Sequence, residues 1–342
     1  MMNPFSPATA HDSASAITKM RIVDGKTGEM KRDPSVFRKF ISREKGAEFP
    51  PESGRYHLYI SYACPWASRC YMFLKLKGLE DAIGMTVTKS MMTKTREDPS
   101  DDHYGWEFAS HDGDPEGGEP DVVNGAKFIR DLYDMADPNA AGRYSVPILW
   151  DKKRKTIVNN ESSEIIKIFN DEFNEYAKHP EVDLFPSHLK SKIDEVDSWT
   201  YNSINNGVYR CGFATTQSAY NQAAKELFDA LDKCEDILSK QRYIAGNEFT
   251  EADVRLFVTF IRFDAVYYVH FKCSRKAIRE YPNLLNFTKD TYQIPGISDT
   301  VHMDHIRNHY YGSHLNINRY GIIPLEPIVD YSASHDRDRF SK

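Results

Sequence analysis

The sequence predicts a two-domain fold in which a mixed α/β domain is followed by an all-helical domain. Two observations lead to this prediction. Up to about residue 177, short apolar runs of strand length alternate with stretches of helical periodicity, whereas from about residue 180 the pattern is almost wholly helical. In addition, a chain of 342 residues of which 40% are hydrophobic can bury a large core, and its length suggests two domains or one domain with sizeable extensions.

The α/β part begins with a strand over residues 57–62, followed by a helix over residues 67–79. The strand is indicated by the short apolar, aromatic and partly β-branched run LYISY. Pro65 suits a first helical turn, because it has no N–H and its φ is already close to the helical value. We therefore expect the helix to start directly after Cys64.

Cys64 is the candidate nucleophile. A thiol at a strand-to-helix junction lies near unpaired backbone N–H groups and the positive end of the helix dipole, which are expected to lower its pKa. The alternative is a small apolar core residue, the common fate of a free cysteine, but the order strand, Cys, Pro, aromatic residue, helix favours a nucleophile. A CxxC centre would need a second thiol where the chain has Ala67, so the centre is monothiol and requires an external thiol. Cys70 is interpreted as a packed helix residue.

The middle of the α/β part continues the alternation of strands and helices. A long irregular segment within it is uncommon in a compact domain and often functional. The order β-α-β, long loop and helix, then β-β-α predicts a thioredoxin-like half-sheet with an insertion. The expected elements are a strand at 83–89, a loop at 91–125, a helix at 128–135, strands at 145–150 and 156–159, and a helix at 164–172.

Three places in this part carry polar or aromatic residues suited to a ligand. Trp106, in the long loop, either anchors that loop or contacts a ligand. The strand at 145–150 is entered through Val146-Pro147, where a cis bond is possible. Ser162 is a good N-cap, and its hydroxyl, the adjacent N–H groups and the helix dipole together suit a carboxylate.

The second half is expected to be a helical bundle packed on the first domain. Long 3.6-residue patterns cover 187–205, 218–240 and 254–269, and Thr250 with Asp253 forms a capping signal before the third of these. Shorter helices separated by prolines follow.

The first 55 residues show no sustained period and are expected to lie over the surface or remain mobile, with the second half of this stretch pinned to the body by Phe37, Phe40, Ile41 and Phe49. The tail beyond about residue 320 is expected to be irregular.

Composition excludes several classes of function. The formal net charge of −6 provides no basic excess for a nucleic-acid or membrane-surface partner. The five cysteines show neither metal-ligand spacing nor a disulfide framework, so we expect a reducing compartment and no metal site. No apolar run reaches the length of a membrane helix, and the first residues lack the features of a signal peptide. A cytoplasmic location is therefore expected.

Several longer strings resemble one known family. The chain is similar to the glutathione transferase superfamily and, within it, to the Xi class, the glutathionyl-hydroquinone reductases. The resemblance implies the glutathione transferase fold, with an N-terminal extension (1–55), a thioredoxin-like glutathione-binding domain (56–177) with an insertion around 91–125, an all-helical domain (178–320) and a tail (321–342). The strings that carry it are YACPWASR, GWEF, VPILWD, NNESSEII, NNGVYRCGFA, the run from RYIAGNEF to VHFKC, YQIPGI and DHIRNHYYGSHLNIN.

The resemblance also implies roles for individual residues. Without it, Glu161 could be an ordinary first-turn carboxylate, and the two tyrosines would be interpreted as core residues. The implied roles are nucleophile for Cys64, packing on glutathione for Trp106, backbone hydrogen bonds to its cysteinyl part for Val146, anchoring of its γ-glutamyl end for Glu161 and Ser162, and contact with the quinol ring for Tyr209 and Tyr310.

The implied activity is glutathione-dependent reduction of glutathionyl-hydroquinones, with no metal or nucleotide and with a homodimer as the assembly. Cys64 would take glutathione from the aromatic ring, and a second glutathione would resolve the mixed disulfide. Three alternatives stay open: a transferase that conjugates glutathione to electrophiles, an omega-like thioltransferase or dehydroascorbate-type reductase, and a non-catalytic ligand carrier on the same fold.

Overall fold

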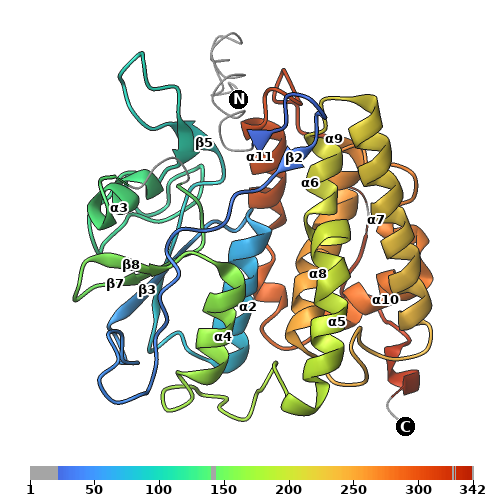
Figure 1. The fold of residues 1–342 in the computed structure, drawn as a ribbon, viewed down its shortest axis with the longest axis horizontal. Helices are drawn as coiled ribbons and strands as arrows, with labels where there is room; N and C mark the ends of the chain where they lie inside the picture. Colours follow the sequence, from blue (N-terminus) through green and yellow to red (C-terminus); the bar gives the residue numbers. More distant parts are fainter. Residues whose placement is uncertain (1–21, 140–143, 326, 328, 341–342) are drawn as a thin grey trace.

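The fold consists of a half built on a β-sheet and a half built of helices, as the sequence predicts. The structure is a computed structural model that describes residues 22–139, 144–325, 327 and 329–340. Figure 1 shows the sheet at the left, with strands β3, β7 and β8, and the helical half at the right. The fold class expected from the sequence, a thioredoxin-like domain followed by a helical bundle, is confirmed.

The central sheet has four strands in the order β4-β3-β7-β8. Strand β3 (Tyr56–Ile60) pairs in parallel with β4 (Gly84–Val87) and antiparallel with β7 (Ile148–Asp151), which pairs antiparallel with β8 (Thr156–Asn159). Every residue of β3 is buried, as expected for an apolar run in the middle of a sheet. The strand ends at Ile60, two residues before the predicted end, and this leaves a short turn before Cys64.

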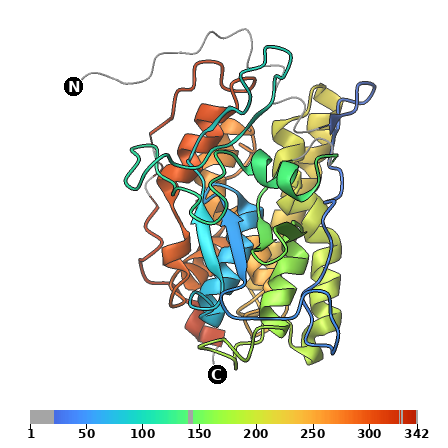
Figure 2. The same ribbon diagram turned by 90° about the vertical axis from the view of Figure 1, so that its left-hand side faces the viewer.

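Two helices separate the sheet from the helical half. Helix α2 (Pro65–Lys77) and helix α4 (Ser162–Asp171) pack against each other there, whereas α3 (Ile129–Ala136) lies on the opposite side of the sheet (Figures 1 and 2). Helix α2 begins at Pro65, directly after Cys64, and ends at Gly78, which adopts a left-handed conformation with φ of 63°. Cys70 is fully buried within it, so its interpretation as a packed residue is confirmed.

The insertion predicted as an irregular loop over residues 91–125 contains a small hairpin. Strand β5 (Met92–Lys94) pairs antiparallel with β6 (Tyr104–Trp106). The prediction was wrong on this point, because strands of three residues are too short to show a period of two.

The helical half contains the remaining helices. Two of the predicted helices, 187–205 and 254–269, each pass into a π-helical turn, η2 (Tyr201–Asn205) and η3 (Phe263–Tyr267). Such turns add a residue to a helix without changing the apolar pattern enough to be seen in the sequence. The other elements are η1 (Ser187–Leu189), α5 (Lys190–Thr200), α6 (Gly207–Gly212), α7 (Gln217–Leu238), α8 (Glu251–Arg262), α9 (Tyr268–His270), η4 (Ile278–Glu280), α10 (Pro282–Tyr292), η5 (Ser298–Thr300), α11 (Met303–Ser313) and η6 (Arg337–Phe340).

The start of α8 has the predicted capping arrangement. The carboxylate of Asp253 accepts hydrogen bonds of 2.8 Å from the backbone N–H of Thr250 and 2.9 Å from its hydroxyl. Helix α8 also joins the two halves, because Val254, Phe257 and Ile261 pack into the core around the sheet while its other face packs into the helical core. None of the helices in the described part of the chain combines the length and apolarity needed to cross a bilayer.

Residues 22–49 form a segment that contacts both halves, which we call the N-terminal strap. Its hairpin, β1 (Ile22–Val23) and β2 (Met30–Lys31), lies against the helical half, where Thr215 N–H donates to Gly28 O at 3.1 Å. The chain then crosses to the sheet, and Lys39 N–H donates to Val158 O at 3.0 Å (Figure 1). The sequence showed no period here and predicted only that apolar residues pin the second half to the body, so the path of the chain comes from the structure.

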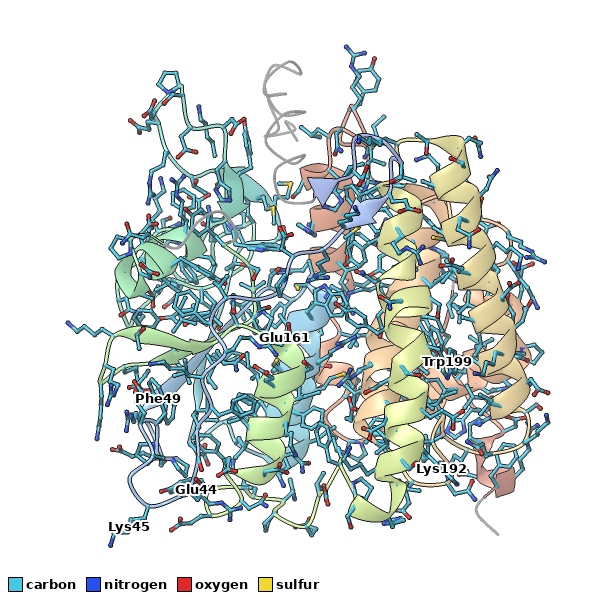
Figure 3. All side chains as sticks on the ribbon, viewed as in Figure 1. Glu44, Lys45, Phe49, Glu161, Lys192 and Trp199 are labelled. Atoms are coloured by element: carbon cyan, nitrogen blue, oxygen red, sulfur yellow. The ribbon has the colours of Figure 1, made fainter. Side chains whose placement is uncertain are left out.

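Apolar side chains hold the second half of the strap against the sheet. Ile41 and Phe49 are each 1% exposed, and Figure 3 labels Phe49 beside the sheet. Phe40, by contrast, is 45% exposed. The strap is therefore part of the core around the sheet and not a loose extension.

Candidate active site

Cys64 is the N-cap of α2, at the junction between β3 and that helix. Its backbone is extended, with φ of −77° and ψ of 117°, and Pro65 occupies the first helical position. The Sγ atom donates a hydrogen bond of 3.5 Å to the carbonyl oxygen of Val146. The local sequence thus places the thiol where it was predicted, facing the strand entered through Val146-Pro147, whose peptide bond is cis.

The pKa of the Cys64 thiol is not lowered, contrary to the expectation from the sequence. Burial raises it above its ordinary value, because the charged thiolate loses its hydration. The backbone N–H groups of Ala67 and Trp66 act in the expected direction and lower it, as do the charges of Arg32 and Arg262, but burial outweighs them. Only the tertiary packing around the junction decides this balance.

Glu161 and Ser162 lie at the N-terminus of α4, beside α2 (Figure 3). The N-cap is Glu161 and not Ser162 as predicted, because the carboxylate of Glu161 accepts from the backbone N–H of Ser163 at 3.2 Å. Ser162 is the first residue of the helix and is 3% exposed. A helix N-terminus with an adjacent carboxylate suits a ligand that carries both a carboxylate and an ammonium group, such as an amino acid end.

The N-terminal strap adds a residue to this anchor that the sequence reasoning missed. The hydroxyl of Ser35 donates a hydrogen bond of 2.9 Å to the Glu161 carboxylate. Burial raises the pKa of Glu161, but hydrogen bonds from Ser163 and Ser35 and the charge of Arg32 together hold that pKa below its usual value. Glu161 is therefore ionised at neutral pH and able to accept from an ammonium group.

Three tyrosine hydroxyls meet in the interior of the helical half. The hydroxyls of Tyr209 (α6) and Tyr310 (α11) are hydrogen bonded to each other, and the hydroxyl of Tyr267 (η3) lies 3.1 Å from that of Tyr310. We call these three side chains the tyrosine trio. The resemblance implied roles for Tyr209 and Tyr310, which the residues alone would place in the core. It implied none for Tyr267, whose place at the end of a π turn no periodicity indicates.

Two members of the tyrosine trio, Tyr267 and Tyr310, are kept in their neutral form. Burial is the main cause that raises the pKa values of Tyr267 and Tyr310 well above the ordinary value, and the neighbouring Tyr209 raises both further. A neutral phenol can donate a proton but does not lose it to bulk water. The trio is thus suited to protonate a strongly basic atom inside the protein.

Trp66 connects the nucleophile to the tyrosine trio. It lies two residues after Cys64, and its ring stacks on that of Tyr209 with centroids 6.4 Å apart and an interplanar angle of 28°. Guanidinium groups lie over the Trp66 ring, that of Arg32 at 4.2 Å and that of Arg69 at 4.4 Å from its centroid. The strap residue Arg32 therefore reaches the surroundings of Cys64, which no sequence signal indicated.

Trp106 belongs to strand β6 and is 4% exposed. Its ring stacks on His309 of α11, with centroids 4.4 Å apart and an interplanar angle of 29°.

Within the described residues no group of three or more His, Cys, Asp or Glu side chains could hold a metal ion. The site residues described above are a cysteine, a carboxylate at a helix N-terminus and phenols, and these suit thiol chemistry.

Residues 63–172 match the family model described as "Glutathione S-transferase, N-terminal domain", and residues 217–290 match "Glutathione S-transferase, C-terminal domain". The chain is 45% identical over 318 residues to glutathionyl-hydroquinone reductase YqjG of Escherichia coli, with 91% of this chain and 93% of that protein covered.

Solved structures show the same similarity. The glutathione-bound structure of YqjG matches with a TM-score of 0.82 at 45% identity, covering 89% of this chain and 96% of that one. The glutathione S-transferase Xi from Phanerochaete chrysosporium also matches with a TM-score of 0.82, at 46% identity, covering 90% of this chain and all of that one. The fold and the sequence therefore point to the same relatives.

Proposed function

Because this chain belongs to the glutathione S-transferase family, and within it to the Xi class, we infer that it is a glutathionyl-hydroquinone reductase. The enzyme uses glutathione to convert glutathionyl-hydroquinones into hydroquinones. The observation that carries this conclusion, beside the relatives, is the monothiol Cys64 at a helix start, connected through Trp66 to the tyrosine trio. A conjugating transferase would instead need a hydroxyl at this place to stabilise the thiolate of glutathione.

We propose that glutathione lies along the cis Val146-Pro147 bond and the N-terminus of α4. Backbone groups of Val146 would pair with its cysteinyl part, because the carbonyl already faces Sγ of Cys64. The ionised Glu161 would accept from the γ-glutamyl ammonium group, and Ser162 would donate to the carboxylate beside it. Trp106 would pack on the remaining face of the ligand.

The first step is attack of the Cys64 thiolate on the sulfur atom of the conjugate. A bond forms between the two sulfur atoms, the bond between sulfur and the aromatic carbon breaks, and its electron pair stays on the carbon, which takes up a proton. The two sulfur atoms are oxidised to a mixed disulfide while the ring carbon is reduced. Tyr209 or Tyr310 would supply the proton, and the hydrogen-bonded trio would share the negative charge that remains.

The second step needs a further glutathione. Its thiolate attacks the mixed disulfide at the glutathione sulfur, which releases oxidised glutathione and restores the Cys64 thiolate. Within the described residues no second thiol stands at the CxxC position, which Ala67 occupies. Cys70 is fully buried, and burial raises its pKa well above the ordinary value.

The test is release of hydroquinone from a glutathionyl-hydroquinone, measured by chromatography with Cys64→Ser and with Cys70→Ala as the matched control. We expect Cys64→Ser to lose turnover and Cys70→Ala to keep it. Mass spectrometry of the wild-type enzyme after one equivalent of conjugate should show one glutathione on Cys64. Retained turnover in Cys64→Ser, or faster conjugation to chlorodinitrobenzene than release of hydroquinone, would contradict the proposal.

We also propose that the enzyme is a homodimer, as the resemblance to the Xi class implies. Tyr267, Tyr310 and Tyr311 are buried within the chain, so their side chains are not available to a dimer interface. The tail offers exposed apolar side chains instead, with Tyr320 78% and Leu325 96% exposed. Light scattering on the purified protein, before and after substitution of Leu325 by serine, tests the assembly and this surface.

A further inference from the structure

Arg262 is a buried arginine that connects the helical half to the turn before Cys64. It is the last residue of α8, is 2% exposed, and lies where α8 passes into the π turn η3. Its Nε donates to Ala63 O at 3.2 Å, and one Nη donates to Tyr62 O at 3.0 Å. The guanidinium thereby binds both carbonyl groups that precede the nucleophile.

Two further hydrogen bonds complete its surroundings. The same Nη donates to the hydroxyl of Ser68 at 2.7 Å, and that hydroxyl donates to Cys64 O at 3.1 Å. The other Nη donates to Val258 O at 2.8 Å, one turn earlier in α8. All four acceptors of Arg262 are neutral.

Arg262 has no carboxylate partner among the described residues, whereas two other arginines with buried guanidinium groups do. Arg55 pairs with Asp151, and Arg255 pairs with Glu251. Taking a cation out of water is costly unless an anion compensates it.

Arg337 is also buried and bonded only to carbonyl oxygens, but it lies away from Cys64. What distinguishes Arg262 is its place: it binds the turn before the nucleophile, and no carboxylate neutralises its charge there, so that charge is available to an anion that forms beside it.

The charge of Arg262 acts on the groups that become anionic in the proposed reaction. Burial raises the pKa values of Cys64, Tyr267 and Tyr310, and the charge of Arg262 lowers each of them. The other groups that face Cys64 are Arg32 from the strap and Cys70 from its own helix.

We propose that Arg262 is a positioning residue that holds the turn at residues 62–64 and supplies the positive charge that balances the anion, first on Cys64 and then on the tyrosine trio. This inference rests on the proposed function, because in that reaction negative charge passes from the Cys64 thiolate to a phenolate of the tyrosine trio. A cation between these two groups balances the charge in both states. A fixed, pre-oriented charge in a site with little water stabilises both states without rearrangement.

The experiment measures alkylation of Cys64 by iodoacetamide between pH 6 and 10, followed by mass spectrometry of the peptide that contains it. No quinol is involved, so the result does not depend on whether the proposed activity is correct. Arg262→Gln should raise the pKa of Cys64 and slow alkylation at pH 8. For each unit by which the pKa of Cys64 rises, alkylation at pH 8 should slow roughly three- to fourfold. The tenfold loss of thiolate is partly offset, because a thiolate of higher pKa is intrinsically more nucleophilic.

Arg262→Lys tests whether the charge of Arg262 or its hydrogen-bonding geometry changes the alkylation rate of Cys64. Lysine keeps the charge but not the fork of donors, so we expect a lower melting temperature with an alkylation profile near that of the wild type. A profile shifted as far as that of Arg262→Gln would overturn the proposal.

Arg69→Gln is the matched control. Arg69 is a second buried arginine next to the site, at 1% exposure, and two of its guanidinium nitrogens have no hydrogen-bond partner. Its removal should change the alkylation rate less than removal of Arg262. An equal or larger effect of Arg69→Gln, or an unchanged rate in folded Arg262→Gln, would overturn the proposal.

If Arg262→Gln does not fold, a second comparison keeps the test decisive. Cys64→Asp places a permanent anion at the position of the thiolate, and Cys64→Asn is its neutral isostere. In an Arg32→Gln background, which removes the other nearby cation, we expect Cys64→Asp to melt at a higher temperature than Cys64→Asn at pH 8. An equal or lower melting temperature of Cys64→Asp would show that the charge of Arg262 does not reach position 64.

Discussion

The hydroxyl of Ser35 donates a 2.9 Å hydrogen bond to the carboxylate of Glu161, although 126 residues separate them in the sequence. Ser35 belongs to the N-terminal strap and Glu161 caps α4, so the strap orients a carboxylate to which we assign glutathione binding. Through this contact the N-terminal strap, whose sequence shows no hydrophobic period, becomes part of the candidate active site. It also makes the function of the strap testable.

Ser35→Ala should weaken the binding of glutathione. A hydrogen bond of this kind contributes about 1 kcal/mol, so we expect KM for glutathione to rise roughly fivefold with kcat little changed. Ser35→Thr keeps the hydroxyl and is expected to restore most of the affinity. Steady-state kinetics with varied glutathione measures this, and an unchanged KM in Ser35→Ala would mean that the strap does not orient Glu161.

Tyr310→Phe should lower kcat for release of hydroquinone by at least about tenfold, because a positioned general acid contributes two to four orders of magnitude and two other hydroxyls remain. The matched control is Tyr311→Phe, whose hydroxyl donates to Ala265 O at 3.1 Å, away from the trio. We expect the control to keep kcat within about twofold. Equal effects of the two substitutions would remove the trio from the mechanism.

The reactivity of Cys64 should depend on pH as expected for a thiol with a raised pKa. Burial raises the pKa of Cys64 above the ordinary value, so in the ligand-free enzyme the thiolate fraction at neutral pH is smaller than for an exposed cysteine and still increases above pH 9. Alkylation of Cys64 should therefore rise about tenfold per pH unit between pH 7 and 8. N-acetylcysteine, measured in parallel, provides the reference thiol, and a plateau for Cys64 below pH 8 would contradict this account.

Gly28→Ala should release the hairpin of the strap from the helical half. Gly28 has φ of +74°, and a Cβ atom there would lie 2.6 Å from Cγ2 of Thr216, so both backbone strain and a clash oppose a side chain. We expect faster cleavage of the strap by trypsin and a higher KM for glutathione. Gly25→Ala is the control, because no atom lies within 4 Å of the Cβ that it would add.

The parts of the molecule that depend on neighbours in the sequence were predicted well. The start of α2 at Pro65 and the capping of α8 by Thr250 and Asp253 follow from residues within one turn of each other. The hairpin at β5 and β6 and the π turns η2 and η3 were missed, because they change a short stretch without changing the pattern around it.

The sequence by itself determined the two-part fold and the place of Cys64, since strand and helix periodicity and a proline after the cysteine are local properties of the chain. Only the tertiary structure decided what surrounds that cysteine. Three residues of the site, Ser35, Arg262 and Tyr267, are separated in sequence from the site residues that they contact by about 40 to 200 positions. The periodicity of the segments that contain them does not indicate a function. The burial that raises the pKa of Cys64 likewise results from packing between the two halves, so it cannot be predicted from any single stretch of the sequence.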